Sequence, residues 1–202
     1  MSCLIRIIAL ISLILYPLKL EKKVRGFMNH VYTNRIRTLF NTFGENSFIE
    51  RNIKVHNGAN IYIKNGVHIA RNVILSTHST TSKLIIGSNS IIGEYCHLTA
   101  CNHISIGCNV LLGRRVLITD NSHGNINTFD MFQAPIKRDI VSKGSVIIED
   151  NVWIGDNVVI LPGITIGFGS IIGASSVVTH SIPPMCVAVG NPAKIIKLLP
   201  KS

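Results

Sequence analysis

The sequence predicts an all-β fold in which short strands coil into a parallel β-solenoid. The main observation is a six-residue spacing of aliphatic residues, carried by Ile148, Ile154, Ile160, Ile166, Ile172 and Val178. A helix of period 3.6 cannot hold these positions on one side, whereas strands wound around a triangular prism can, since six residues make one strand and one corner. Residue types that tolerate tight corners lie between them: Asp150, Asn151, Asp156, Asn157, Gly163 and Gly169. Three such units are expected to close one coil.

The same spacing occurs earlier in the chain, with interruptions. It is carried by Ile63, Ile69, Leu75, Ile86, Ile92, Leu98, Ile106, Leu112 and Ile118. The step from Leu98 to Ile106 is longer than six residues, so two extra residues are expected to bulge at a corner near Cys101 and Asn102. After Ile118 a polar, turn-rich stretch predicts a loop over residues 119–146 that leaves the solenoid wall. Long loops in a regular scaffold are often functional.

Composition and charge agree with one solenoid domain and an appendage. The chain has 202 residues, of which 47% are hydrophobic and 15% charged, as expected for a solenoid with a dense aliphatic core. Its 20 Lys and Arg against 10 Asp and Glu favour anionic partners, such as phosphate-bearing cofactors or acidic lipid surfaces. The sequence carries no recognisable nucleic-acid-binding motif, so nucleic acid is not an expected partner.

Residues 1–45 are expected to form a separate N-terminal helical segment. Residues 3–18 are almost wholly apolar, but the run is shorter than the ~20 residues that a membrane-spanning helix needs. Basic residues follow this run more than they precede it, which is unlike a secretory signal. Two interpretations stay open: the segment caps the exposed end of the solenoid, or it lies on an anionic membrane surface.

An ordered set of motifs occupies the C-terminal half. Residues 152–167 read VWIGDNVVILPGITIG, and residues 190–194 read GNPAK. Over roughly residues 60–197 this order resembles the hexapeptide-repeat acyltransferases, in particular the branch with galactoside and maltose acetyltransferases and O-acetyltransferases of bacterial surface polysaccharides. The resemblance implies a left-handed parallel β-helix over residues 46–190, a cofactor-contacting tail over residues 191–202, and a homotrimer with active sites between subunits.

His123 opens the ejected loop, five residues after the inward Ile118. The resemblance implies that this histidine is a general base. Transfer of an acyl group from a thioester to a sugar hydroxyl requires loss of the hydroxyl proton, which a neutral imidazole with an ordinary pKa near ~6.5 can accept. Alternatively, His123 only hydrogen-bonds its own loop. Asp120 either orients His123 or an acceptor hydroxyl, or caps a corner turn with its carboxylate.

The expected cosubstrate is acetyl-CoA, and no metal is expected. The resemblance implies that Trp153 walls the tunnel for the pantetheine arm, although it could instead pack between subunits. Gly155 would allow close approach of the cofactor. Ala174 and Thr179 match positions that contact the pantetheine and adenosine portions.

Two lysines extend the expected cofactor site into the tail. Lys194 and Lys197 match basic positions near the CoA phosphates, and ammonium groups bind such anionic oxygens. The alternative is that they form a solvated face of the C-terminus.

These features predict an O-acetyltransferase that acts on a sugar hydroxyl of a bacterial surface polysaccharide, or of its precursor, by direct transfer from acetyl-CoA. The alternatives are a non-catalytic trimeric scaffold and an acetyltransferase for serine or a nucleotide sugar. A γ-class carbonic anhydrase would need three histidines on zinc, and the spacing of His97, His103 and His123 does not fit. The acceptor is expected to be a sugar or lipid-linked glycan, in the cytoplasm or at the cytoplasmic face of the inner membrane.

Overall fold

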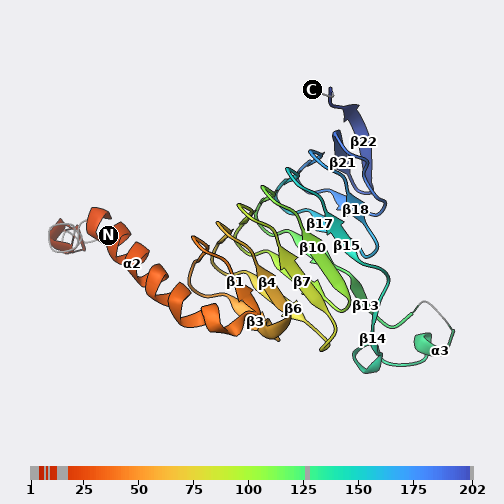
Figure 1. Cartoon of the computed structure of the whole chain (residues 1–202), viewed down its shortest axis with the longest axis horizontal. Coiled ribbons are helices and arrows are strands. Elements are labelled where there is room, and N and C mark those ends of the chain that lie inside the picture. The colour runs from red at the N-terminus through yellow and green to blue at the C-terminus, as the bar shows by residue number, and fades with distance from the viewer. Residues whose placement is uncertain (1–4, 7, 9, 13–17, 126–127, 201–202) are drawn as a thin grey trace.

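A computed structural model describes residues 5–6, 8, 10–12, 18–125 and 128–200, and shows a three-sided β-solenoid preceded by a long helix (Figure 1). Within the apolar run of residues 3–18, the described residues from 5 to 12 are helical, whereas residues 3–4, 7, 9 and 13–17 lie outside the described part. The long helix α2 spans Leu18–Ile36. None of the helices in the described ranges combines the length and apolar composition needed to cross a membrane.

Three parallel sheets form the walls of the prism. Sheet A contains β1 (Thr42–Phe43), β4 (Ile61–Ile63), β7 (Lys83–Ile86), β10 (His103–Ile106), β15 (Val146–Ile148) and β18 (Thr165–Ile166). Sheet B contains β2 (Phe48–Ile49), β5 (His68–Ile69), β8 (Ile91–Ile92), β11 (Leu111–Leu112), β16 (Trp153–Ile154), β19 (Ile171–Ile172), β21 (Cys186–Gly190) and, antiparallel at its end, β22 (Ala193–Leu198). Sheet C contains β3 (Lys54–His56), β6 (Ile74–Thr77), β9 (His97–Ala100), β12 (Leu117–Thr119), β17 (Val159–Ile160) and β20 (Val177–Val178).

The aliphatic residues at six-residue spacing form the core, as predicted. Every one of them, from Ile63 to Val178, is buried, with at most 1% of its surface exposed. Successive coils align these residues in rows, so that Leu98 pairs with Ile118 and Ile118 with Ile160. Because neighbours along a strand point to opposite sides, the residues next to them in each strand face outward and are free to form a functional surface.

The predicted corners and interruptions are confirmed. Asn151, Asn157, Gly163 and Gly169 all have positive φ, the left-handed conformation that asparagine and glycine tolerate best. The expected bulge lies at residues 101–102, between β9 and β10.

The ejected loop has structure of its own, which the sequence pattern did not predict. The strand β13 (Asn121–His123) pairs antiparallel with β14 (Ile140–Ser142) and forms a hairpin that projects from the wall (Figure 1). Beyond β13 lie the short helix α3 (Thr128–Met131) and the 3₁₀ turn η3 (Pro135–Lys137). There are two further 3₁₀ turns. The turn η1 (Arg37–Leu39) connects α2 to β1, and the turn η2 (Gly58–Asn60) connects β3 to β4.

Candidate active site

His123 is the last residue of β13, and it pairs with Ile140 across the hairpin. Its side chain is exposed, and no hydrogen bond or ion pair to the imidazole is found within the described ranges. The backbone beyond it is fixed: Gly124 has φ +74°, and its N–H donates to the carbonyl of Asp139 at 2.8 Å. A side chain at Gly124 would come within 2.9 Å of Arg138 Cδ, so the turn requires glycine. The hairpin therefore presents an accessible imidazole on a constrained backbone.

The carboxylate of Asp120 closes the corner that contains the two-residue bulge. The Asp120 side chain is fully buried, and it accepts hydrogen bonds from the backbone N–H groups of Cys101 (2.7 Å), Asn102 (2.8 Å) and His103 (2.7 Å). Both carboxylate oxygens are used in this way, and among the described residues no contact links Asp120 to His123. These bonds favour the corner-capping interpretation of Asp120, whose direct part in catalysis stays a prediction.

A polar row on the outer face of sheet C leads to the hairpin, and the sequence analysis did not identify it. Four successive strands of sheet C carry a polar residue at the same register position: His56, Ser76, Thr99 and Thr119. Thr99 Oγ1 lies 2.7 Å from His78 Nε2, and the carbonyl of Thr99 accepts a hydrogen bond from the Asn121 side chain at 2.9 Å. Inward and outward side chains alternate along each strand, so polar residues next to the inward aliphatic residues are the sequence signal for such a row.

His97 lies beside this row and is half-buried. Burial lowers the pKa of His97, and the nearby His78 and His56 lower it further. Its imidazole is therefore neutral at physiological pH and can donate and accept hydrogen bonds without charge.

Trp153 projects outward from sheet B, as predicted, with 52% of its surface exposed. It shares one outward row with Ile171, Val187 and Lys197, each paired to the next in adjacent strands. Lys197 enters this row because the pairing of β21 with β22 shifts register between Val187 and Ala188, leaving Ile196 as an extra residue.

The register shift also brings the two tail lysines onto the same face. Lys194 pairs with Val189 and Lys197 with Val187, and these two valines point to the same side of β21. An indole and two ammonium groups therefore share the outer face of sheet B near the C-terminal end of the solenoid.

The other predicted cofactor residues are more dispersed. Gly155 is required by packing between coils, because a Cβ there would lie 2.7 Å from the backbone nitrogen of Ala174. Ala174 is exposed at the corner that follows β19. Thr179 follows β20 of sheet C, and its hydroxyl is 2.9 Å from His180 Nδ1. The structure thus joins Trp153 with the two lysines, and leaves Thr179 on a different wall.

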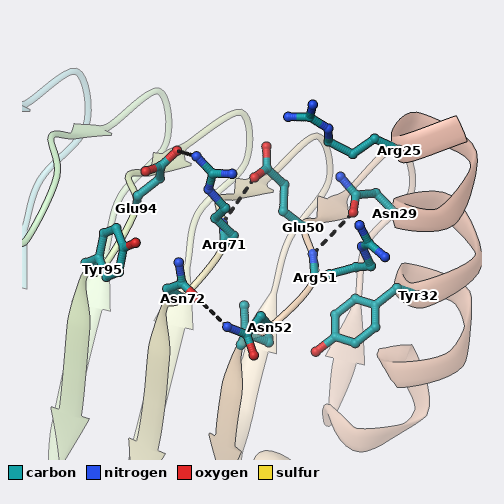
Figure 2. A pocket seen from close by; sticks show the side chains of 11 residues that line it. Arg25, Asn29, Tyr32, Glu50, Arg51, Asn52, Arg71, Asn72, Glu94 and Tyr95 are labelled. Atoms are coloured by element: carbon teal, nitrogen blue, oxygen red, sulfur yellow. Dashed lines mark hydrogen bonds and ion pairs between the residues drawn. The ribbon is translucent and has the colours of Figure 1, made fainter. Parts of the chain in front are cut away.

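A separate groove of about 950 Å³ lies at the opposite end of the solenoid, between α2 and the corners that follow β2, β5 and β8. Arg25, Arg51, Arg71, Glu94 and Tyr95 are among its lining residues, and Figure 2 shows their side chains around it. Arg71 is paired with Glu94 at 3.1 Å. Because β13 leaves the middle of the solenoid (Figure 1), this groove is not part of the His123 site. Within the described ranges, no group of three or more His, Cys, Asp or Glu is arranged to hold a metal ion.

Comparison with known proteins agrees with this arrangement of coils. Residues 145–180 match the family described as bacterial transferase hexapeptide (six repeats). The putative lipopolysaccharide biosynthesis O-acetyl transferase WbbJ of Escherichia coli K12 is 38% identical over 117 residues, which are 56% of this chain and 60% of WbbJ. The repeats of residues 145–180 are those of the bacterial transferase hexapeptide family, and the fold of the chain is similar to that of hexapeptide-repeat acyltransferases. Its solenoid is the left-handed parallel β-helix expected from the resemblance. The match spans less than two-thirds of WbbJ.

Two solved acyltransferases have the same fold over most of their length. AntD, an N-acyltransferase from Bacillus cereus in complex with dTDP and 3-hydroxybutyryl-CoA, is 25% identical with a TM-score of 0.70, over 84% of this chain and 88% of AntD. A variant of AntD was solved with dTDP-4-amino-4,6-dideoxyglucose and coenzyme A. The hexapeptide-repeat containing acetyltransferase VCA0836 from Vibrio cholerae is 28% identical with a TM-score of 0.61, over 86% of this chain and 82% of VCA0836.

Proposed function

We propose that this protein is an O-acetyltransferase that moves the acetyl group of acetyl-CoA to a sugar hydroxyl of a bacterial surface polysaccharide or its precursor. The observation that carries the proposal is the accessible imidazole of His123 on a constrained hairpin, within a chain related to WbbJ. An exposed imidazole with no partner in the described chain is free to bind an acceptor hydroxyl.

His123 acts as the general base. Its neutral imidazole accepts the proton of the sugar hydroxyl while the hydroxyl oxygen attacks the thioester carbonyl carbon. The C–O bond forms and the carbonyl becomes a tetrahedral oxyanion. When this intermediate collapses, the C–S bond breaks and the imidazolium returns the proton to the thiolate of CoA. The acetyl group passes directly to the sugar, with no acyl-enzyme.

Coenzyme A binds along the outer face of sheet B. Trp153 provides an exposed aromatic wall for the pantetheine arm, and Lys194 and Lys197 provide charge for the phosphates. The CoA complex of AntD, which shares the fold, supports this role for the solenoid.

The protein works as a homotrimer whose active sites lie between subunits. Exposed apolar side chains form a row across sheet B, from Ile91 (43%) through Leu111 (42%) to Trp153 (52%), and such a surface favours burial against another copy. A neighbouring subunit whose hairpin edge meets this face would bring its His123 to the Trp153 surface.

The polar row on sheet C binds the acceptor. Its member Thr119 and the neighbouring Asn121 and His97 side chains are partly exposed and offer uncharged donors and acceptors beside the hairpin, which suits a sugar ring. The acceptor is a lipid-linked glycan or a nucleotide-linked sugar. WbbJ, described as a putative lipopolysaccharide biosynthesis O-acetyl transferase, supports a glycan, and the AntD complex with dTDP-4-amino-4,6-dideoxyglucose supports a nucleotide-linked sugar. N-acylation of an amino sugar is therefore the second candidate reaction, favoured by the likeness to AntD.

Thiol release from acetyl-CoA tests the proposal. The purified protein would be incubated with acetyl-CoA and, in parallel, with lipid-linked sugars, nucleotide-linked sugars or nucleotide-linked amino sugars. Acceptor-dependent release with a hydroxyl sugar supports O-acetyl transfer, and release only with amino sugars supports the second candidate. Binding of coenzyme A without release in any arm would favour a non-catalytic scaffold.

A further inference from the structure

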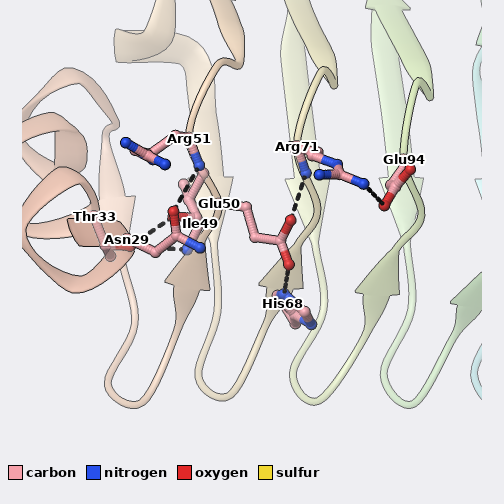
Figure 3. Close-up of polar contacts among 8 residues, drawn as sticks. All are labelled: Asn29, Thr33, Ile49, Glu50, Arg51, His68, Arg71 and Glu94. Carbon is pink, nitrogen blue, oxygen red and sulfur yellow. Dashed lines mark hydrogen bonds and ion pairs between the residues drawn. The ribbon is translucent and has the colours of Figure 1, made fainter. Parts of the chain in front are cut away.

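The helix α2 contacts the solenoid through polar side chains and through the partly buried Tyr32 and Ile36, which pack against the core. Asn29 and Thr33 are its buried residues, with 8% and 6% of their surface exposed. The Thr33 hydroxyl donates to the carbonyl of Ile49 at 2.8 Å and lies 3.0 Å from the Ile49 nitrogen, whose N–H it accepts. Asn29 Oδ1 accepts the N–H of Arg51 at 3.4 Å, and Figure 3 shows these contacts at the edge of the first coil. The helix therefore caps the edge of β2 with hydrogen bonds.

The exposed apolar side chains of α2 lie on its opposite face. Five of them form what we call the outer stripe: Leu20, Val24, Phe27, Met28 and Val31. Spacings of three and four residues place them on one side of the helix. At about 100° per residue, the centre of the outer stripe lies roughly 180° from Asn29 and Thr33. A helix that packs its own core has the reverse arrangement, with the apolar stripe inward.

The described part of the chain leaves the outer stripe uncovered. Its members are exposed by between 39% (Val24) and 67% (Phe27). Figure 1 shows α2 extending away from the first coil, so the solenoid does not fold back over it. Before α2, the described residues Ile5, Ile8, Leu10 and Ile11 are also about half exposed or more, from 49% to 62%. An exposed apolar surface such as the outer stripe marks a binding surface.

Charge identifies the partner. The helix α2 contains five basic residues against a single acidic one, Glu21, which is paired with Arg25 at 2.6 Å. Lys23 and Arg35 are exposed, have no ion pair within the described ranges and lie beside the outer stripe, whereas Lys22 lies on the same side of the helix as Asn29. An apolar stripe flanked by ammonium and guanidinium groups complements an anionic bilayer, which offers acyl chains and phosphates at neighbouring depths.

We propose that α2 docks on an anionic lipid bilayer through its outer stripe. Leu20, Val24 and Phe27 enter the boundary between headgroups and acyl chains, while Lys23 and Arg35 contact lipid phosphates. The hydrogen bonds of Asn29 and Thr33 hold the solenoid to the other side of the same helix. The helix thereby fixes the solenoid at the membrane surface. This docking does not depend on the acetyl-transfer reaction.

Co-sedimentation of the full chain with vesicles tests the docking. Wild-type protein is expected to bind vesicles containing phosphatidylglycerol, to lose binding as salt rises, and to bind phosphatidylcholine vesicles weakly. The double substitution Phe27→Ser with Val31→Ser is expected to weaken binding to the anionic vesicles by about tenfold or more. Lys23→Glu with Arg35→Glu is expected to abolish the preference for anionic lipid.

A matched control removes apolar side chains elsewhere. Phe132→Ser with Ile136→Ser changes two residues of the ejected loop that are 90% and 83% exposed, and it should leave vesicle binding unchanged. Far-ultraviolet circular dichroism of each variant checks that the helix and solenoid remain folded. Wild-type binding by the Phe27/Val31 variant would overturn the proposal. So would a smaller oligomer of that variant in lipid-free light scattering, because the stripe would then be an interface between copies.

Discussion

His123 and Trp153 lie on opposite sides of the prism within one chain. His123 belongs to the hairpin that leaves the corner between sheet C and sheet A, because β13 lies in sequence between β12 and β15. Trp153 lies on the outer face of sheet B, the wall opposite that corner. A base on one side and a cofactor surface on the other can act together only if a second subunit brings them together.

Mixed oligomers should therefore recover activity. His123→Ala and Trp153→Ala are each expected to reduce thiol release, but co-expressed chains should form some sites with both wild-type residues. A random mixture leaves about a quarter of the sites intact, because each site takes the two residues from different subunits. Recovery toward that fraction, measured on tagged and purified mixed trimers, supports a shared site. A mixture no more active than the mean of its parents would mean that each site uses one chain.

The six-residue spacing predicted the core because it is a local property of the sequence. Each aliphatic residue from Ile148 to Val178 turns inward simply by its position in the repeat. The bulge at residues 101–102 was predicted for the same reason. The role of Asp120 stayed open between corner capping and catalysis, because its N–H donors come from the preceding coil and the sequence does not show which corner a carboxylate reaches. The position of Lys197 beside the Trp153 row likewise depends on a register shift that spacing alone does not reveal.

The Asp120→Asn variant should unfold more easily. The amide would replace one acceptor oxygen by a donor that faces backbone N–H groups, so the free energy of unfolding should fall by about 2–4 kcal/mol. Asp156→Asn is the matched control, since Asp156 is exposed and accepts one N–H, from Arg114, through a single oxygen. Urea denaturation of both variants measures the difference. Lost turnover with wild-type stability would instead assign Asp120 a direct catalytic role.

Gly155→Ala should destabilise the solenoid by about 1–3 kcal/mol, because the added Cβ meets the backbone of the next coil. Gly26→Ala is a suitable comparison: no atom lies within 4 Å of a Cβ at that position in α2. Alanine there should be neutral or stabilising by up to about 1 kcal/mol, since it favours the helix. Thermal denaturation followed by circular dichroism distinguishes the two. Equal stability of Gly155→Ala and wild type would show that the coils can separate to admit a methyl group.

Alkaline pH should weaken the fold through Cys96. Burial raises the pKa of the Cys96 thiol to about 11 from an ordinary value of 9.0. Between these pH values the unfolded chain releases the thiol proton while the folded chain keeps it. The contribution of the protonated thiol to the free energy of unfolding is therefore complete below pH 9 and is lost as pH rises toward 11. The free energy of unfolding should therefore fall by about 1 kcal/mol more, from pH 8 to pH 10, in wild type than in Cys96→Val. Identical pH dependence in the two proteins would show that the thiol ionises as freely in the fold as outside it.

The most direct test of the account is the rate of acceptor-dependent thiol release by His123→Ala, compared with wild type at saturating acetyl-CoA. The account predicts that kcat falls by about two to four orders of magnitude while coenzyme A affinity is retained, because the base contributes to proton transfer and not to cofactor binding. His123→Ala with a kcat close to that of wild type would contradict the account, because proton removal would then be the task of another group.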